Sequence, residues 1–272
     1  MHQSKPLSRF SRAHLAALLV ASIASFAGAV QAQTIQTDRE HFAQSSEVVG
    51  KGRVQIETSV AVARDGSSME RSYMTATPTL LRFGVSNDVE LRVATDGFLR
   101  YADRESVMQS RSVTKGFGDV SLGMKWHAAK QSGLSPSLAV LAGATLDSGS
   151  AEFRGNGVRP SVALAAEWKL HDGMSVAFMP GVTFDKTADG RSFTSTQLGL
   201  TFSKAWTGKF STSVEYAAPR LAAREFGGDV AYYGFGGAYL LSKNSQLDFA
   251  FQHGTTSATP DMAVVVGFST RF

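Results

Sequence analysis

The chain has 272 residues, with 27 Lys and Arg against 23 Asp and Glu, and it has no cysteine. The absence of cysteine excludes disulfide bridges and thiolate metal sites, and the small charge excess gives no basic surface for nucleic acid. Beyond the first 32 residues no stretch has 18 consecutive apolar residues, so a membrane protein with this sequence has to cross with strands rather than helices.

The first 32 residues have the parts of a secretory signal peptide. Lys5, Arg9 and Arg12 form a basic start, an apolar run follows, and small residues lead to Ala32. The run is shorter than the ~20 residues that a membrane-spanning helix needs. We therefore predict cleavage after Ala32, which leaves 24 basic against 23 acidic residues. No cysteine follows the cut, so no lipid anchor is expected.

After the predicted cut, residues 33–49 are polar and aperiodic, and we predict a periplasmic N-terminal extension there. From residue 50 to residue 272, apolar and polar side chains alternate in successive segments, which is the period of β-strands with two different faces. About twelve strands are expected, an even number as in single-chain bacterial barrels. The predicted strands are 52–63, 70–83, 88–99, 117–128, 136–147, 157–169, 174–185, 192–205, 209–218, 229–241, 245–253 and 262–272.

The lengths of the connections indicate which medium the apolar faces meet. A soluble β-sandwich also alternates, so the period alone leaves that class open. Here short connections, such as 84–87 and 170–173, alternate with long ones, such as 100–116 and 148–156. This alternation is typical of outer-membrane barrels, which have tight periplasmic turns and longer outer loops.

The last segment, 262–272, ends on an aromatic residue with no further element to cover its edge. Such a strand has to pair with another strand or becomes an aggregation site. We predict that it pairs with the first strand, and that Phe272 closes the barrel from the aromatic girdle. The predicted fold is therefore all-β, a single closed antiparallel transmembrane β-barrel over residues 50–272 in the cell outer membrane.

Extending the alternation around the barrel places charged side chains in the lumen. Glu57, Asp119 and Glu215 are among them. Two interpretations stay open for these charges: a structural plug of salt bridges, or a constriction that sets solute selectivity. The residues predicted to form the lumen constriction are Arg82, Glu90, Arg92, Lys125, Glu167, Lys169, Asp248 and Arg271.

Three stretches resemble the outer-membrane transporter family labelled MetA-pathway of phenol degradation. They are residues 55–58 (QIET), 78–92 (PTLLRFGVSNDVELR) and 116–126 (GFGDVSLGMKW). The resemblance implies a barrel that passes small molecules across the outer membrane. The Arg and Lys residues of the predicted constriction make small aromatic or anionic solutes the candidates. For a barrel in the outer membrane, the expected partners are outer-membrane lipid, lipopolysaccharide and the barrel assembly machinery. The label fixes no substrate, and residues 146–149 depart from the expected pattern.

Two other functional classes stay open. A structural or adhesive barrel without transport differs little in sequence from a channel. An outer-membrane lipid hydrolase needs Ser and His within hydrogen-bond reach, but none of His41, His127, His171 and His253 is followed two positions later by Ser. A pair across strands stays open. We predict no enzyme activity, catalytic residue, metal or cofactor. The 100–116 loop is expected to fold into the mouth, contact lipopolysaccharide phosphates or remain solvated.

Overall fold

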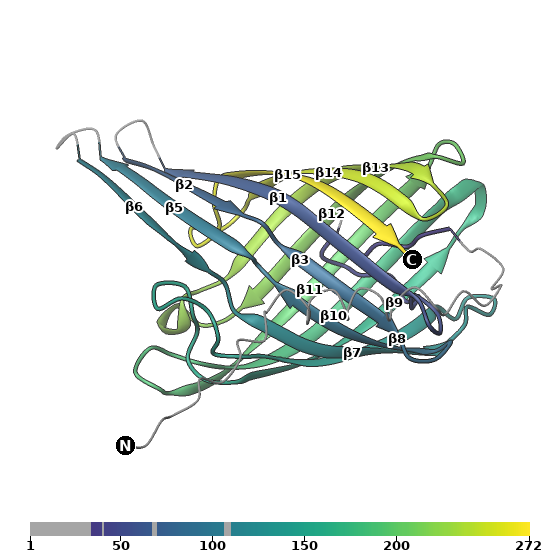
Figure 1. Ribbon diagram of the computed structural model, residues 1–272, viewed down its shortest axis with the longest axis horizontal. Coiled ribbons are helices and arrows are strands. Elements are labelled where there is room, and N and C mark those ends of the chain that lie inside the picture. The colour runs from purple at the N-terminus through teal and green to yellow at the C-terminus, as the bar shows by residue number, and fades with distance from the viewer. Residues whose placement is uncertain (1–33, 40, 67–69, 106–109) are drawn as a thin grey trace, which may run out of the picture. The chain divides into compact units, whose positions relative to one another are not determined.

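The computed structural model describes residues 34–39, 41–66, 70–105 and 110–272, and the predicted signal peptide lies outside them. The described strands form one antiparallel sheet, and its last strand pairs with its first (Figure 1). Two single 3-10 turns, η1 (His171–Gly173) and η2 (Arg224–Phe226), interrupt the connections. The strands are β1 (Val54–Gly66), β2 (Glu70–Ala76), β3 (Thr79–Gly84), β4 (Val89–Thr95), β5 (Phe98–Glu105), β6 (Ser110–Phe117), β7 (Val120–Ala129), β8 (Ser137–Thr145), β9 (Arg159–Lys169), β10 (Met174–Lys186), β11 (Ser192–Ala205), β12 (Phe210–Leu221), β13 (Val230–Ser242), β14 (Ser245–Gly254) and β15 (Met262–Arg271).

The predicted closed barrel is confirmed. Strand β15 pairs with β1 from Gln55 opposite Arg271 to Arg64 opposite Met262. The described sheet has 15 strands, but three pairs of them, β2–β3, β4–β5 and β6–β7, are single long strands broken by one short irregularity each. Counting each broken pair once gives the twelve predicted strands. Among the described residues no helix has the length and apolar character needed to span a membrane.

The segment predicted as the loop 100–116 is instead the hairpin of β5 and β6. Thr79 lies opposite Thr95, whereas Ala76 lies opposite Leu99, so one extra residue is inserted at the break between β4 and β5. Gly97 occupies this break with a φ of 67°, and a Cβ there would lie 2.2 Å from the carbonyl oxygen of Thr77. Such a bulge needs glycine. Arg100, Asp103 and Lys115 of this segment therefore lie on strands that continue past the apolar belt.

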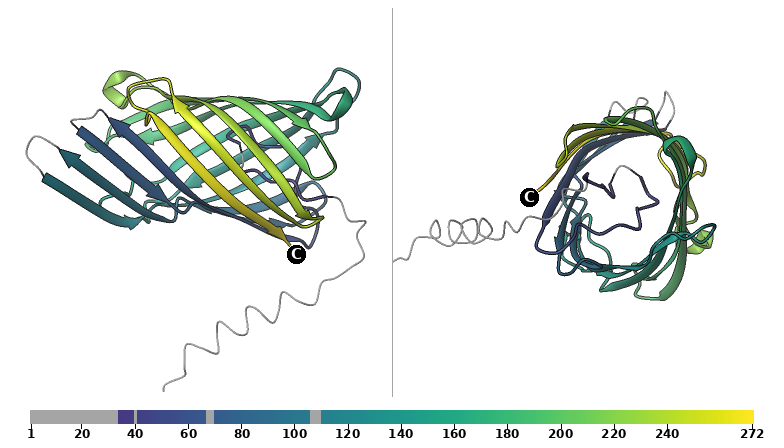
Figure 2. Two further views of the ribbon diagram at one scale, coloured as in Figure 1. Left: turned by 90° about the horizontal axis from the view of Figure 1, so that it is seen from above. Right: turned by 90° about the vertical axis from the view of Figure 1, so that its right-hand side faces the viewer.

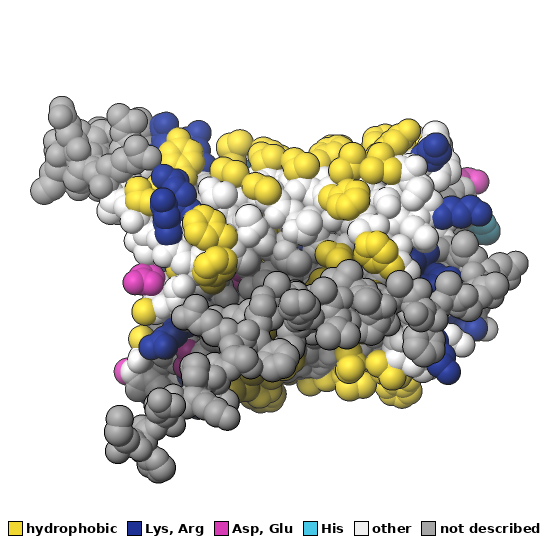
Figure 3. All heavy atoms as spheres, in the orientation of Figure 1, with side chains coloured by type: hydrophobic (Ala, Val, Ile, Leu, Met, Phe, Trp, Pro, Cys, Tyr) yellow, Lys and Arg dark blue, Asp and Glu magenta, His cyan; other side chains and the backbone are white. Residues whose placement is uncertain are grey.

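The distribution of apolar side chains is the inverse of that in a soluble protein. Val60, Leu122 and Trp126 are 52%, 49% and 49% exposed on the outer wall, while Arg82 and Lys125 are fully buried inside. Figure 3 shows hydrophobic side chains spread along one outer face of the barrel. This pattern matches a wall in contact with lipid and a polar lumen.

The two ends of the barrel differ in their connections. Short turns such as 170–173 and 243–244 lie at the end where β1 begins and β15 finishes. The longer connections 146–158, 222–229 and 255–261 lie at the other end. By the rule for outer-membrane barrels, the first end is periplasmic and the second is extracellular.

Candidate functional site: a charged lumen occupied by the N-terminal segment

The described residues between 34 and 49, here called the inner segment, run through the interior of the barrel (Figure 2, right). Four carboxylates of the barrel wall accept hydrogen bonds from its backbone N–H groups. Glu57 accepts from Asp38 at 2.8 Å and from Arg39 at 3.0 Å. Glu215 accepts from Phe42 at 2.9 Å, Glu167 from Ser46 at 3.2 Å, and Glu90 from Val49 at 2.9 Å. The structure therefore places these residues inside the barrel and not in a periplasmic extension. A segment without sheet partners still has to satisfy its buried N–H groups, and the lumen acids do so.

Asp38 lies at the centre of a fully buried ionic cluster. Its carboxylate pairs with Arg92 Nη1 at 2.6 Å, with Arg82 Nη2 at 3.4 Å, and with the Lys125 ammonium. Arg82 also pairs with Glu57 at 3.0 Å and with Glu90 at 2.9 Å. These side chains are at most 10% exposed.

The cluster is balanced, with three cations against three carboxylates. Buried charge is costly unless it is paired and hydrogen-bonded, and here each wall cation contacts a carboxylate of the wall, of the inner segment, or of both. Arg82 also donates to the carbonyl oxygens of Gln36 and Glu47, at 2.9 and 3.0 Å. The wall alone holds three cations and two carboxylates, so Asp38 completes the balance and ties the inner segment to the wall.

The structure gathers four of the eight predicted constriction residues and separates the others. Arg82, Glu90, Arg92 and Lys125 belong to the Asp38 cluster. The other four residues lie apart from this cluster. Glu167 accepts a hydrogen bond from the Ser46 hydroxyl group, and Lys169, which is more than half exposed, pairs with Glu47 at 3.1 Å. Asp248 is buried beside a second cavity, and Arg271 donates to the Asn244 side chain at 3.0 Å.

Three charged residues of the site were not predicted as part of it. Glu57 and Glu215 were expected in the lumen but outside the constriction, and they hold the inner segment. Asp38 carried no signal at all, because its neighbours show neither strand nor helix periodicity.

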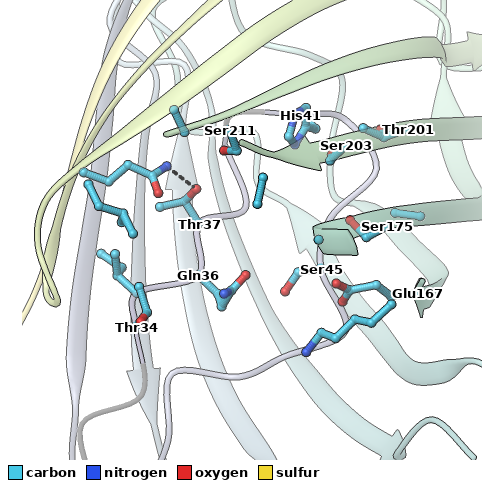
Figure 4. Close-up of a pocket in the computed structure, with 18 of the residues that line it drawn as sticks. Thr34, Gln36, Thr37, His41, Ser45, Glu167, Ser175, Thr201, Ser203 and Ser211 are labelled. Atoms are coloured by element: carbon cyan, nitrogen blue, oxygen red, sulfur yellow. Dashed lines mark hydrogen bonds between the residues drawn. The ribbon is translucent and has the colours of Figure 1, made fainter. Parts of the chain in front are cut away.

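Several cavities border the inner segment, which narrows the lumen without filling it, and two of them are lined by both Asp38 and His41. The larger has a volume of about 460 Å³ and lies between the inner segment and the wall from β9 to β14. Its lining is rich in hydroxyl groups, which come from Thr37, Ser45, Ser175, Thr201, Ser203 and Ser211 (Figure 4). The second has a volume of about 280 Å³, and Arg39, Tyr232 and Asp248 are among its lining residues. Hydroxyl groups donate and accept hydrogen bonds, so the larger cavity suits a small solute with polar groups.

At the extracellular end, Asp119 ties the 146–158 connection to the barrel rim. It accepts the backbone N–H groups of Gly149 and Gly155, both at 2.8 Å, and pairs with Arg159. Burial alone would raise the pKa of Asp119. The backbone N–H groups of Gly155, Gly149 and Ser148 and the charge of Arg159 nevertheless hold the pKa below its usual value. The ionised carboxylate therefore keeps this connection folded over the rim.

A Ser–His contact is present in the lumen, between the inner segment and one strand and not between two strands. His41 Nε2 of the inner segment hydrogen-bonds Ser213 Oγ of β12. Both side chains lie beside Glu215, which accepts the neighbouring Phe42 N–H. The contact is thus a further tether between the inner segment and the wall.

Phe272 follows the closing strand. Its backbone N–H donates to the Val54 carbonyl oxygen at 2.8 Å, and its side chain is 68% exposed on the outer surface. The position fits an aromatic ring in the interface girdle.

Phe272→Ala is expected to lower the amount of assembled barrel in the membrane, because an interface anchor is lost where the barrel closes. Leu134→Ala is the matched control, since it removes an apolar side chain that is 94% exposed in a periplasmic turn. The fraction of heat-modifiable protein on a detergent gel measures assembly. Equal fractions for both variants would remove Phe272 from the closure.

The comparisons with known proteins agree with this architecture. The fold is similar to the COG4313 outer membrane channel from Pseudomonas putida F1, with 10% identity, a TM-score of 0.59, and coverage of 84% of this chain and 98% of that one. It is also similar to the translocator domain of the autotransporter NalP from Neisseria meningitidis, with 11% identity, a TM-score of 0.53, and coverage of 81% and 88%.

No curated protein sequence matches the chain significantly. The family model described as Putative MetA-pathway of phenol degradation matches residues 37–272, which include most of the inner segment and the whole barrel. The lipid-facing exterior, the closed strand order and the structural neighbours are those of an outer-membrane protein. The chain is therefore an outer-membrane β-barrel and belongs to the family described as Putative MetA-pathway of phenol degradation.

Proposed function

We propose that the protein is a narrow outer-membrane channel for small aromatic solutes that carry polar groups, with the inner segment and the Asp38 cluster as its constriction. The observation that carries the proposal is the hydroxyl-lined cavity of about 460 Å³ left between the inner segment and the wall. The family description names phenol degradation. A phenol combines an apolar ring with a hydroxyl group, and hydroxyl-rich walls match that hydroxyl group without excluding the ring.

The other predicted constriction residues act on either side of this passage. Glu167 and Lys169 line the larger cavity, and Asp248 lines the second. Arg271 lies at the periplasmic end of β15, beside the turn at Asn244. Mixed charges of this kind set ion preference in narrow pores. The expected partners are a small-molecule solute, outer-membrane lipid and lipopolysaccharide, and the barrel assembly machinery, and we propose no enzymatic role.

Conductance in planar bilayers and uptake of phenol into liposomes test the proposal. The wild-type channel should give small, resolvable openings, and phenol should enter faster than into protein-free liposomes. Ser203→Phe should abolish most of the conductance and most of the phenol uptake, because it places an aromatic ring in the larger cavity. Leu200→Phe is the matched control, since Leu200 is 47% exposed on the lipid face of the same strand. A wild-type protein that neither conducts nor passes phenol would favour the structural alternative, a barrel plugged by its own ionic cluster.

A further inference from the structure

The extracellular end of the barrel carries a small sheet whose two faces hold opposite charges. This outer sheet comprises the last residues of β1 (61–66) together with β2, β5 and β6. It continues the barrel wall past the breaks near Pro78, Gly97 and Gly118, and projects at the end opposite Phe272 (Figure 1). Directly opposite residues on neighbouring strands share a face, so the register assigns every position to a face.

The lipid-facing side chains of β1 identify the outward face. Val60 and Val62 are 52% and 44% exposed on the outer wall, and Arg64 follows them on the same face. Arg64 lies opposite Tyr73, and Val62 lies opposite Thr75. The outward face therefore includes the odd-numbered positions of β2.

Basic residues occupy the outward face across the remaining strands. Arg71 and Thr75 share the outward face of β2, Thr75 lies opposite Arg100, and Arg100 lies opposite Lys115. The described bases on this face are Arg64, Arg71, Arg100 and Lys115. In the backbone register, Arg71 of β2 lies opposite position 104 of β5, and position 104 lies opposite position 111 of β6.

Acidic residues occupy the alternate positions, which face the mouth of the barrel. Asp65 lies opposite Ser72, and Ser72 lies opposite Asp103. In the backbone register, position 70 of β2 lies opposite position 105 of β5. Among the described side chains of the outer sheet, bases therefore occupy the outward face and acids the face towards the mouth.

The basic face has no internal compensation among the described residues. Arg100 and Lys115 lie directly opposite each other, an arrangement that destabilises a sheet unless an anion lies between the charges. Within the described part of the chain, no carboxylate forms an ion pair with Arg64, Arg71, Arg100 or Lys115. The Arg71 Nε is covered and has no hydrogen-bond partner there.

Apolar side chains accompany these bases on the same face. Phe98 and Phe117 lie opposite each other, with ring centroids 5.7 Å apart, and are 37% and 61% exposed. Val113 lies on the same face of β6 as Lys115, two residues before it, and is 42% exposed. Figure 3 shows Lys and Arg side chains beside hydrophobic ones over this end of the barrel.

We propose that the outward face of the outer sheet binds a phosphorylated glycolipid of the outer leaflet. The aromatic pair contacts the acyl chains at the membrane boundary, and the bases bind the phosphate groups. Guanidinium groups bind phosphate oxygens through paired N–H donors, which suits Arg71 and Arg100. The bound anion separates the opposed charges of Arg100 and Lys115. The site lies outside the lumen and is independent of the channel proposal.

The test uses the full chain purified in detergent and titrated with bisphosphorylated lipid A. Wild-type protein should bind this lipid more tightly than the same lipid with its phosphates removed. Arg100→Gln with Lys115→Gln should weaken binding about tenfold (about 1.4 kcal/mol). The control pair, Lys186→Gln with Arg224→Gln, removes two exposed charges from the same end but outside the outer sheet, and should bind as the wild type does.

Heat modifiability and single-channel conductance of each variant are measured alongside binding. Both should stay at wild-type values in the Arg100/Lys115 variant, because neither residue contacts the lumen cluster. Equal affinity of the two variants, or equal affinity of wild type for the lipid with and without phosphates, would overturn the proposal. A wild-type protein that does not conduct would instead contradict the channel proposal, and the lipid-binding result would still test the lipid site by itself.

Discussion

Arg82→Ala should lower the free energy of unfolding of the barrel by about 3–5 kcal/mol, the usual cost of breaking a buried ion pair by removing one partner. Arg82 contacts three buried carboxylates, those of Asp38, Glu57 and Glu90. Without the guanidinium, three carboxylates share only Arg92 and Lys125. The carbonyl oxygens of Gln36 and Glu47 each lose one of two donors and keep Gln55 Nε2 and Lys125 Nζ, respectively. Urea unfolding in lipid vesicles, followed by tryptophan fluorescence, measures the difference.

Lys209→Ala is the control for this prediction. Lys209 is exposed in a periplasmic turn, so its replacement should change the free energy of unfolding by less than about 0.5 kcal/mol. If Arg82→Ala behaved like Lys209→Ala, the cluster would contribute nothing to stability and the inner segment would need another anchor.

Deletion of residues 34–49 should raise the single-channel conductance several-fold. The deletion removes the backbone that crosses the lumen and joins the two flanking cavities, of about 460 and 280 Å³, into one passage. It also removes Asp38, so the wall cluster keeps three cations against Glu57 and Glu90. The selectivity of the widened channel should therefore shift towards anions relative to the wild type, and the reversal potential in a salt gradient measures this shift.

Asp38→Asn, tested by the same conductance and reversal-potential measurements, separates the effect of the Asp38 charge from the effect of the volume that the inner segment occupies. The amide keeps the size of the side chain and removes one negative charge, so the selectivity should move towards anions while the conductance rises less than in the deletion. A deletion variant with wild-type conductance would mean that the inner segment does not limit flow.

The alternation of side chains predicted the barrel and most of its lumen charges, because a period of two fixes the face of each residue regardless of its partners. Glu57, Arg82, Glu90 and Lys125 are fully buried inside, as predicted. Alternation does not give the register between strands. Arg82 in fact lies directly opposite Arg92. Two wall carboxylates, Glu57 and Glu90, and a third from a distant part of the chain compensate these opposed cations.

The inner segment supplies one of those carboxylates, and no pattern in the sequence predicted its place. The described residues between 34 and 49 pair with no strand, and carboxylates scattered over β1, β4, β9 and β12 accept their backbone N–H groups. The outer sheet was missed for a different reason. Its strands carry charges on both faces, so β5 and β6 lack the apolar face that marks a membrane strand.

A disulfide between the inner segment and the wall tests the central claim most directly. A Cβ at Gly199 of β11 would lie 2.9 Å from the Ala43 Cβ, so a small shift brings two cysteines to the separation of about 3.8 Å found in disulfides. The natural chain has no cysteine. Ala43→Cys with Gly199→Cys should therefore form one disulfide in the membrane, seen by mass spectrometry and as a reductant-sensitive gel shift. Ala43→Cys with Leu200→Cys should form none, because Leu200 faces the lipid. Two free thiols in the first variant would contradict an inner segment lodged in the lumen.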